Sequence, residues 1–381
     1  MSNKTANKRI VIFSTAYLPL IGGAELAVKE ITDRLKDFEF DLVCARIAKN
    51  LPKNECLGNV NVCRVGFGCV LDKYLLPFRG CLKARRLAKK GGGYAAIWAI
   101  MASYGGLAAL FYKLLNPSVP LLLTLQEGDS EAHILKRVGI FYFLWKKIFT
   151  KADYVQAISG YLADFGCRHG ARCPVEVVPN GVDLEKFKIR PAGRRENPRV
   201  VITTSRLVPK NGVDVLIKAA GLLKNEIPDL KFLIAGSGWQ EEELKKTAKE
   251  SGVENGVEFL GGVAPEKIPG LLAEADIFVR ASRSEGLGNS FLEAMAAGLP
   301  VIGTPVGGIP DFLKDGETGL FAKVGDAEDL ARKINLLLTN ERLRNQIAAT
   351  GQKLVWENYS WDKIARKMGD IFRSLTIMRG L

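Results

Sequence analysis

Short apolar runs alternate with amphipathic segments along most of this chain. The run at 9–14 ends in small residues, and a glycine-bearing loop and a helical pattern through Leu35 follow it. Uniformly apolar runs of this length are typical of parallel strands that are buried on both faces of a sheet. In the first half we therefore expect further strands at 41–46, 60–65, 95–101, 120–125 and 152–158, with helices at 72–90 and 107–115.

The second half of the chain restarts the same pattern. A run at 200–204 leads into a loop and then into a helical segment at 213–223. Short apolar runs follow at 230–235, 257–260, 277–279 and 301–302, with helical segments between them. Strands that alternate with helices predict a doubly wound parallel sheet. Because 381 residues exceed one typical core, we expect two Rossmann-like domains.

The domain boundaries follow from local composition. We place the first domain at 1–187 and the second at 199–360. The segment between them, 188–198, is basic, polar and bears Pro and Gly, as interdomain linkers do. The longest uncharged stretch, 94–112, approaches a membrane span in length, but Gly105 and Gly106 interrupt it. We interpret it as a buried strand, a glycine turn and a helix.

The cysteines and histidines argue against disulfides and metal chemistry. Seven cysteines are present, which is an odd number, and no C-x-x-C pair occurs. We expect free thiols, mostly in the core, in a cytoplasmic protein. Only two histidines are present, so we expect no metal site. The first apolar run is too short to be the core of a signal peptide.

The net charge of +13 is concentrated in the first half. Residues 1–190 hold 28 basic and 16 acidic residues, whereas the rest of the chain is nearly neutral. Such an asymmetry indicates that one face meets an anion, which nucleic acid, an anionic membrane or a phosphorylated substrate would supply. The segment 135–151 mixes aromatic and basic residues, so it is either an interfacial amphipathic helix or a core helix with a basic back. The basic helical segment 72–90 is either a solvated face or a contact with an anionic surface.

The stretch 283–310 carries the strongest indication of chemistry. Glu285 precedes a glycine-bearing turn, and a helical run from Phe291 to Ala297 follows. Asn289 or Ser290 would cap this helix, and Gly298 would end it. Free N–H groups at such a helix start suit a phosphate. Seven residues separate Glu285 from Glu293, so one carboxylate can lie beside a sugar while the other reaches hydroxyls further along the ligand. An ordinary strand–loop–helix unit with two surface glutamates fits the spacing equally well.

Two further groups of polar residues follow predicted strands. Arg206 and Lys210 lie on the loop after the run at 200–204, and two cations at the carboxyl edge of a parallel sheet suit a diphosphate. Gln126, Glu127 and Asp129 follow the run at 120–125. Open α/β sheets bind ligands at this end of their strands, so we expect these residues on the acceptor side.

Several motifs resemble one known family. The phrase E-G-L-G-N-S-F-L-E-A-M-A-A-G-L-P-V-I at 285–302 resembles the E-x7-E signature of the retaining, nucleotide-sugar-dependent glycosyltransferases of family 4. The loop G-G-A-E at 22–25 and the phrase P-N-G-V-D-x-x-x-F at 179–187 resemble motifs of the same family. The resemblance implies the GT-B fold, in which two Rossmann-like domains face each other across a cleft and a C-terminal helix, here 361–381, crosses back to the first domain.

The resemblance also implies roles for individual residues. The nucleotide base would lie near Val263, and Glu293 would accept the ribose hydroxyls. Glu285 would lie near the sugar hydroxyls. The diphosphate would contact Arg206 and Lys210 and, through backbone amides, Leu287, Gly288, Asn289, Ser290, Gly22 and Gly23.

Two positions depart from the family pattern. The family lysine directly precedes the glycine of its loop, but this chain has Asn211 there and Lys210 one residue early. A family histidine near position 126 is replaced by Gln126, whose amide can hydrogen-bond a hydroxyl but cannot work as an acid or a base.

From the resemblance we expect a retaining hexosyltransferase that uses a UDP- or GDP-sugar and needs no cofactor and no metal. The expected acceptor is a glycan or a lipid-linked or phosphorylated molecule. The basic first half adds an anionic membrane surface as a partner and a peripheral place on the inner face of the membrane. A nucleotide-sugar epimerase or a phosphorylase of the same architecture is the alternative. A basic nucleic-acid-binding protein is a third reading, but no recognition motif supports it, so we expect no nucleic acid.

Overall fold

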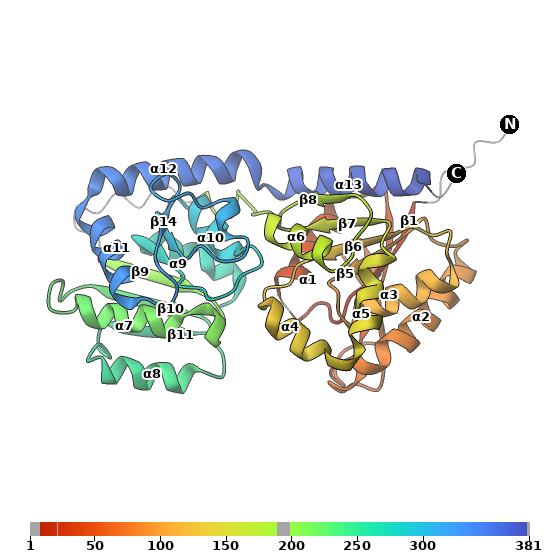
Figure 1. Cartoon of the computed structure of the whole chain (residues 1–381), viewed down its shortest axis with the longest axis horizontal. Helices are drawn as coiled ribbons and strands as arrows, with labels where there is room; N and C mark the ends of the chain where they lie inside the picture. The colour runs from red at the N-terminus through yellow and green to blue at the C-terminus, as the bar shows by residue number, and fades with distance from the viewer. Residues whose placement is uncertain (1–7, 21, 189–198, 379–381) are drawn as a thin grey trace. The chain divides into compact units, whose positions relative to one another are not determined.

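The computed structural model describes residues 8–20, 22–188 and 199–378 (Figure 1). They divide into two compact units. The first comprises Met1–Glu127, Glu131–Asn180 and Trp361–Leu381, and the second comprises Gly128–Ser130 and Gly181–Ser360. Of the expected linker at 188–198, every residue but Lys188 lies outside the described residues.

The first unit contains an eight-stranded sheet in the order β3-β4-β2-β1-β5-β6-β7-β8. Its strands are β1 (Arg9–Phe13), β2 (Glu39–Ala45), β3 (Asn54–Leu57), β4 (Val60–Val65), β5 (Ala96–Ile100), β6 (Leu121–Leu125), β7 (Tyr154–Ala157) and β8 (Val175–Val177). Neighbouring strands are parallel except β3 and β4, which form an antiparallel pair. The sequence pattern did not predict β3, whose residues are only partly buried.

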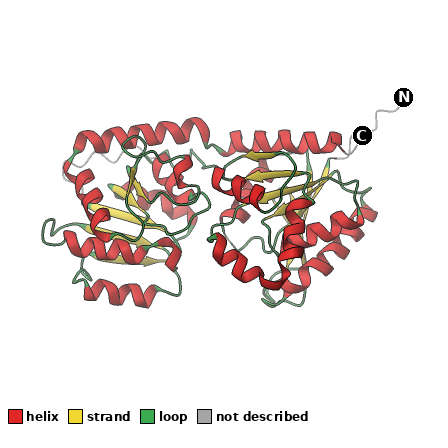
Figure 2. Cartoon of the chain, in the orientation of Figure 1, coloured by secondary structure: helices red, strands yellow, loops and turns green. Residues whose placement is uncertain are grey.

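Helices lie against this sheet (Figure 2). They are α1 (Gly23–Arg34), α2 (Asp72–Lys90), α3 (Tyr104–Leu115), α4 (Glu131–Val138), α5 (Tyr142–Thr150), α6 (Gly160–Arg168) and α13 (Trp361–Met378). The stretch at 94–112 forms β5, a turn and the first part of α3, as its glycines indicated. No helix among the described residues is both long and apolar enough to cross a bilayer.

The second unit contains a six-stranded parallel sheet in the order β11-β10-β9-β12-β13-β14. Its strands are β9 (Val200–Thr204), β10 (Lys231–Ala235), β11 (Val257–Gly261), β12 (Ile277–Val279), β13 (Val301–Gly303) and β14 (Leu320–Phe321). Its helices are α7 (Val213–Leu223), α8 (Glu241–Glu250), α9 (Ile268–Glu274), α10 (Asn289–Ala296), α11 (Ala327–Thr339) and α12 (Glu341–Asn358). The predicted fold class, two doubly wound α/β units, is thereby confirmed.

Two local expectations for the first unit are wrong. The segment 135–151 is not one helix, because Gly139 takes a positive φ of 52° and a short 3-10 turn at Gly139–Phe141 separates α4 from α5. The seven cysteines are free, as expected, but only Cys44, Cys63 and Cys81 are buried. Of the other four, Cys56 lies in the edge strand β3, Cys167 near the end of α6, and Cys69 and Cys173 in loops.

The C-terminal helix α13 completes the core of the first unit. Its buried face runs from Trp361 to Leu375 and packs on α1. Phe372 is fully buried, and its ring centroid lies 5.1 Å from that of Trp98 and 5.7 Å from that of Phe38. Edge-on aromatic contacts of this kind add to the free energy of burial.

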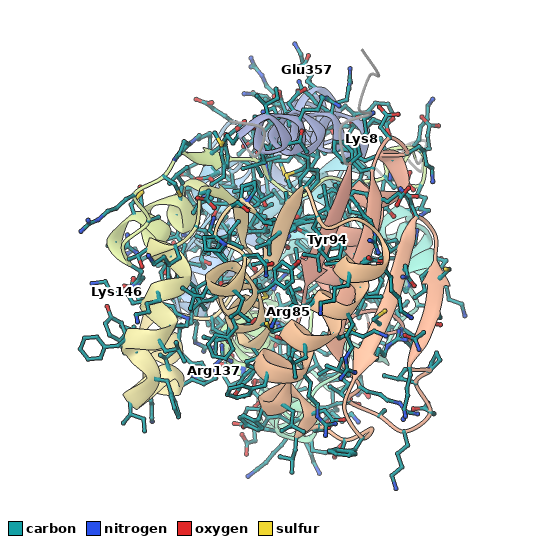
Figure 3. All side chains as sticks on the ribbon, turned by 90° about the vertical axis from the view of Figure 1, so that its right-hand side faces the viewer. Lys8, Arg85, Tyr94, Arg137, Lys146 and Glu357 are labelled. Atoms are coloured by element: carbon teal, nitrogen blue, oxygen red, sulfur yellow. The ribbon has the colours of Figure 1, made fainter. Side chains whose placement is uncertain are left out.

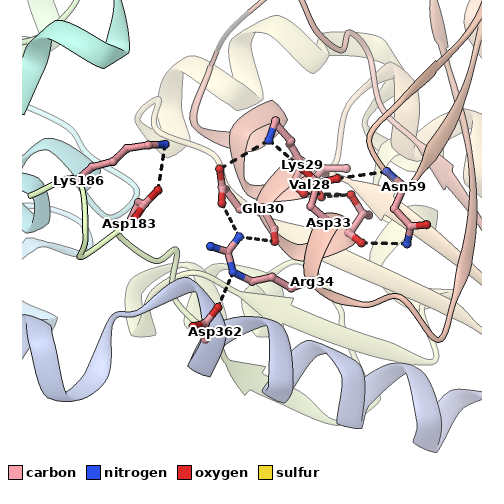
Figure 4. Close-up of polar contacts among 10 residues, drawn as sticks. Val28, Lys29, Glu30, Asp33, Arg34, Asn59, Asp183, Lys186 and Asp362 are labelled. Atoms are coloured by element: carbon pink, nitrogen blue, oxygen red, sulfur yellow. Dashed lines mark hydrogen bonds and ion pairs between the residues drawn. The ribbon is translucent and has the colours of Figure 1, made fainter.

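Ion pairs at the surface contribute less to this packing. Figure 4 shows Arg34 of α1 between Glu30 and Asp362, with 2.7 Å between Arg34 Nε and Asp362 Oδ1. Because the Asp362 side chain is 78% exposed, this pair is worth at most about 1 kcal/mol. Burial of the apolar face of α13, and of Phe372 above all, therefore holds the helix in place.

We predict that Phe372→Ala lowers the free energy of unfolding by about 3–5 kcal/mol, because it removes a buried ring and leaves a cavity. Ile377→Ala on the same helix is the matched control, since Ile377 is 67% exposed, and its effect should stay within about 0.5 kcal/mol. Urea unfolding followed by circular dichroism measures both values. Equal losses for the two variants would show that α13 is not held by its buried face.

Candidate active site

The strand order of the second sheet marks a place for a ligand. The chain runs outward from β9 through β10 to β11, and then resumes on the other side of β9 at β12. In doubly wound sheets, ligands bind outside the carboxyl ends of the strands at such a reversal. Arg206 follows β9, and Arg280 follows β12. Both cations therefore belong to the edge where a ligand is expected.

The helix α10 begins at this edge. Its N-cap is Gly288, with a φ of 98° and no capping side chain, so the expectation that Asn289 or Ser290 caps the helix is wrong. Both lie instead in the first turn, whereas Gly298 follows the helix with a φ of 78°, as expected of a glycine after a C-cap. A residue with a side chain would be strained at Gly288 because of its positive φ. Since glycine has no side chain, the N-cap residue does not cover the first N–H groups of α10.

The backbone beside Glu285 is fixed by a second glycine turn. Gly308 N–H donates to Glu285 O over 3.3 Å, and a Cβ at Gly307 would lie 1.7 Å from the same oxygen. Only glycine permits this approach, which explains the glycine at position 307. The loop that carries Glu285 is thereby held against the loop that follows β13.

Arg280 connects the polar groups of this site. Its Nη1 donates to Ser290 Oγ over 2.8 Å, and its Nη2 donates to Asn211 Oδ1 over 2.9 Å. The same Nη2 lies 2.6 Å from Glu285 Oε2, and both side chains of this ion pair are nearly buried, with 12% and 13% of their surface exposed. Asn211 in turn donates to Arg206 O over 2.7 Å. One guanidinium therefore joins the loops after β9 and β12 to the first turn of α10.

Glu293 lies one turn further along α10 in an unusual environment. Part of the residue remains accessible, but protein surrounds its carboxyl, and this desolvation raises the pKa of Glu293 from 4.5 to about 7, although the charge of Arg280 works in the opposite direction. Among the described residues no donor makes a hydrogen bond to this carboxyl. A carboxyl held in this state is a frequent mark of a functional site, because a stable fold gains nothing from it.

The two cations predicted on the loop after β9 differ in their surroundings. The side chain of Arg206 is exposed and has no ion-pair partner among the described residues. Lys210 Nζ donates to Gly128 O and to Asp129 Oδ1, each over 2.9 Å, within the second compact unit. Of the pair, only Arg206 thus keeps its charge uncompensated.

The remaining predicted residues are described within their own units. Val263, half-buried, follows β11 and the positive-φ residue Gly261. In the first unit, Gly22 and Gly23 stand at the start of α1, after β1. Gln126 Oε1 accepts a hydrogen bond from Asn180 over 3.3 Å.

Glu127 is buried, and its Oε1 accepts the N–H of Ala102 over 2.8 Å. Burial raises the pKa of this carboxyl, and its Oε2 has no hydrogen-bond partner among the described residues. The backbone at Met101, just before Ala102, has a φ of 66°, which is rare for a residue with a side chain. The carboxyl edge of the first sheet therefore also carries a strained, polar site.

Comparison with known proteins agrees with this arrangement. Residues 21–186 match the model of Glycosyltransferase Family 4, and residues 185–354 match that of Glycosyl transferases group 1. The chain belongs to the GT-B glycosyltransferases of family 4. The two matches meet at residues 185–186 and together cover residues 21–354.

Relatives and solved structures extend this result. A GDP-mannose-dependent alpha-(1-6)-phosphatidylinositol monomannoside mannosyltransferase of Mycobacterium tuberculosis is 33% identical over 244 residues, which are 60% of this chain and 63% of that protein. The structure resembles sucrose-phosphate synthase from Thermosynechococcus elongatus, with a TM-score of 0.82, 21% identity and coverage of 97% and 99% of the two chains. It also resembles HepE of Anabaena in complex with UDP and glucose, with a TM-score of 0.79, 22% identity and coverage of 96% and 100%.

Sequence reasoning overlooked Arg280 in this glycosyltransferase. The signal was available, because a charged residue directly after a buried strand stands at the carboxyl edge of its sheet. Arg280 makes its contact with Asn211 across 69 residues of sequence, and no local pattern shows such a contact.

We predict that Glu293→Gln stabilises the free glycosyltransferase at pH 8. The folded carboxyl has a pKa of about 7, against 4.5 without burial, so folding is progressively weakened as pH rises from 4.5 to 7. Above pH 7 the loss is about 3 kcal/mol, and the neutral amide avoids it. At pH 5 the gain should be below about 1 kcal/mol. Chemical unfolding at both pH values measures the difference, and an equal gain at pH 5 and pH 8 would contradict a buried, ionising Glu293.

Proposed function

We propose that this family 4 enzyme is a retaining hexosyltransferase that transfers a sugar from a UDP- or GDP-sugar without a metal ion. The observation that carries the proposal is the site at the start of α10, where an uncapped helix terminus, Arg206 and a carboxyl with a pKa near 7 share one sheet edge. Nucleotide sugars combine a diphosphate with two vicinal ribose hydroxyls. Cations and free amides suit the former, and a carboxylate suits the latter.

Each part of the donor then has a partner in the second unit. The two ribose hydroxyls donate hydrogen bonds to the two carboxylate oxygens of Glu293. These bonds stabilise the charged carboxylate, which burial destabilises in the free protein. Arg206 and the amides of Leu287, Gly288, Asn289 and Ser290 bind the diphosphate. Val263 lies against the base. Glu285, which Arg280 and the N–H of Gly286 hold in place, accepts hydroxyls of the transferred sugar.

The proposed chemistry breaks the bond between the anomeric carbon and the diphosphate oxygen. Negative charge grows on that oxygen in the transition state, and fixed cations and amides that bind it more strongly there lower the barrier. The acceptor hydroxyl attacks from the face that the diphosphate leaves, and a phosphate oxygen takes its proton. A two-carboxylate hydrolase scheme fits poorly with this proposal, because we assign Glu293 to the ribose.

We propose UDP or GDP as the nucleotide of the donor, because similar proteins are described with one or the other. The mycobacterial relative is described as GDP-mannose-dependent, and the HepE structure holds UDP and glucose. On the acceptor side we propose Gln126, Glu127 and Asp129, together with Gly22 and Gly23 next to the donor. A lipid-linked or phosphorylated acceptor would match the basic first half.

We propose that the first unit meets an anionic membrane through the turn between α4 and α5. Ile140 is 90% exposed and Phe143 is 80% exposed, and cationic side chains of both helices are exposed beside them in the chain: Lys136, Arg137, Lys146 and Lys147. Figure 3 labels Arg137 and Lys146, together with Arg85 of the basic helix α2. Apolar side chains that enter the headgroup boundary and cations that attract anionic lipids are the two requirements of interfacial binding.

We predict that either UDP or GDP raises the melting temperature of the enzyme, and that Arg206→Ala abolishes the shift. A ligand at a hundred times its dissociation constant adds about 2.7 kcal/mol to folding stability. Arg342→Ala, which changes an exposed arginine of α12, is the control and should leave the shift unchanged. A panel of UDP- and GDP-sugars, assayed for slow donor hydrolysis, then identifies the sugar. No shift with any nucleotide would refute the proposed activity, whereas release of sugar phosphate with free phosphate alone would indicate a phosphorylase.

We predict that the protein sediments with vesicles that contain anionic lipid and not with neutral ones. The double variant Ile140→Ser with Phe143→Ser should reduce the bound fraction several-fold, because about 2 kcal/mol of apolar burial is lost at each site. Leu222→Ser is the matched control, since Leu222 is a half-exposed apolar residue of α7. Equal sedimentation with neutral and anionic vesicles would contradict the membrane contact.

A further inference from the structure

We propose that Arg280 is the second cation for the leaving diphosphate and replaces the lysine that the family pattern places at position 211. The inference rests on the proposed function and adds a residue that neither the motif nor its spacing indicated. It explains why this chain carries Asn211 in the lysine position without losing a charge at the site.

Arg280 stands at the sheet edge where the diphosphate is expected. Arg280 N–H donates to Ile302 O over 3.0 Å, so its backbone continues the β12–β13 ladder and its side chain starts at the carboxyl edge of the sheet. Its guanidinium then lies 2.8 Å from Ser290 Oγ, in the first turn of α10. An anion held by the first N–H groups of this helix is therefore a neighbour of Arg280.

The charge of the diphosphate calls for a second cation. A nucleoside diphosphate carries at least two negative charges, and the two cations predicted for it were Arg206 and Lys210. Lys210 is engaged by Asp129, which leaves Arg206 as the one cation of that pair without an acidic partner among the described residues. Arg280 is itself paired with Glu285, but through Nη2. Its Nη1 and Nε make no ion pair among the described residues, and a guanidinium does not lose its proton in proteins, so Arg280 brings a second permanent cation to the same edge.

The guanidinium of Arg280 carries an unsatisfied hydrogen-bond donor. Arg280 Nε is buried and has no hydrogen-bond partner among the described residues. A buried N–H without an acceptor costs about 1–3 kcal/mol, and native structures rarely retain one without a use. Protein covers Nε in the free enzyme, so a phosphate oxygen reaches it when the covering groups move aside on binding. The oxygen would then be a strong acceptor, because charge-assisted bonds of this kind are about twice as strong as neutral ones.

Asn211 lies directly beside the Arg280 guanidinium. It is buried, with 2% of its surface exposed, and its Oδ1 accepts from Arg280 Nη2. A lysine there would bring an ammonium group next to the guanidinium in a nearly buried place, where like charges repel strongly. Arginine at 280 and lysine at 211 are therefore alternative ways to supply one charge, and this chain has the former.

The test separates diphosphate binding from a role in holding Glu285. Binding of a nucleoside diphosphate and of the bare nucleoside is measured by titration calorimetry and ligand-observed NMR, with UDP and uridine or with GDP and guanosine. For Arg280→Met we expect affinity for the diphosphate to fall 10- to 100-fold and affinity for the nucleoside to stay within twofold. An arginine that only positions Glu285 would leave diphosphate affinity unchanged, because Glu285 is assigned to the sugar. An arginine that only holds Ser290 and the Arg206 loop in place would lower that affinity, but a lysine at position 211 would not restore it. Either result would overturn the inference.

Two further variants make the result specific. Asn211→Lys in the Arg280→Met background should restore at least tenfold of the lost diphosphate affinity, whereas Asn211→Lys alone should lower the melting temperature and add no affinity. Arg283→Met is the matched control, because Arg283 pairs with Asp214 over 2.7 Å and is more exposed. It should bind the diphosphate as the wild type does. No recovery in the double variant would overturn the exchange between positions 211 and 280.

The outcomes also distinguish the inference from the function on which it rests. A wild-type protein that binds neither UDP nor GDP refutes the proposed function. A wild-type protein that binds one of them, with an Arg280→Met variant that binds it equally, refutes only the role of Arg280. Should Arg280→Met fail to fold, Arg280→Lys keeps the charge but loses Nε, and a three- to tenfold loss confined to the diphosphate is then expected.

Discussion

The ion pair between Arg280 and Glu285 is the constraint around which the second unit is arranged. Burying two charges removes their hydration, and their attraction compensates for this only when geometry and further hydrogen bonds are good. Here Ser290 and Asn211 supply those bonds, and two glycines let the loops approach closely enough. A Cβ at Gly212 would lie 1.8 Å from Ala281 O, much as one at Gly307 would collide with Glu285 O. A buried ion pair of this kind adds little to the free energy of unfolding, because its desolvation offsets its attraction. A charged ligand therefore best explains its place at the reversal of the sheet.

The first unit follows the same division between a buried sheet and a polar edge. Its central strands β1, β5 and β6 are almost wholly buried, so hydrophobic burial fixes the sheet. Its own strand order reverses between β1 and β5, and there Thr15 Oγ1 lies 3.0 Å from Ser103 Oγ. Glu127 is held beside this edge by the N–H of Ala102, after the strained residue Met101. Stable strands thus carry loops whose polar groups are only partly satisfied, as a binding edge requires.

Much of the fold could be predicted because buried strands and helix faces require apolar residues at regular spacings in the sequence. The strand at 60–65 and the helix at 72–90 have the bounds that periodicity gave. The failures have physical causes. Gly139 breaks an otherwise helical pattern with a positive φ, and β3 pairs antiparallel at a sheet edge, where partial burial leaves no apolar run. At the site, the motif indicated Glu285, Glu293 and Arg206. It did not indicate Arg280, whose partners lie up to 69 residues away, nor that Gly288 rather than Asn289 or Ser290 begins α10.

Asn211 shows why a departure from a motif is best judged in three dimensions. In the sequence it reads as the loss of a cation, and Lys210, one residue early, looks like a shifted replacement. In the structure, Lys210 pairs with Asp129. The Asn211 side chain accepts a hydrogen bond from Arg280 through Oδ1 and donates one to the backbone oxygen of Arg206 through Nδ2. Because an amide both donates and accepts, whereas an ammonium only donates, asparagine can hold an arginine side chain that a lysine would repel. Asn211, which departs from the family motif, therefore accommodates the positive charge of Arg280, which follows strand β12.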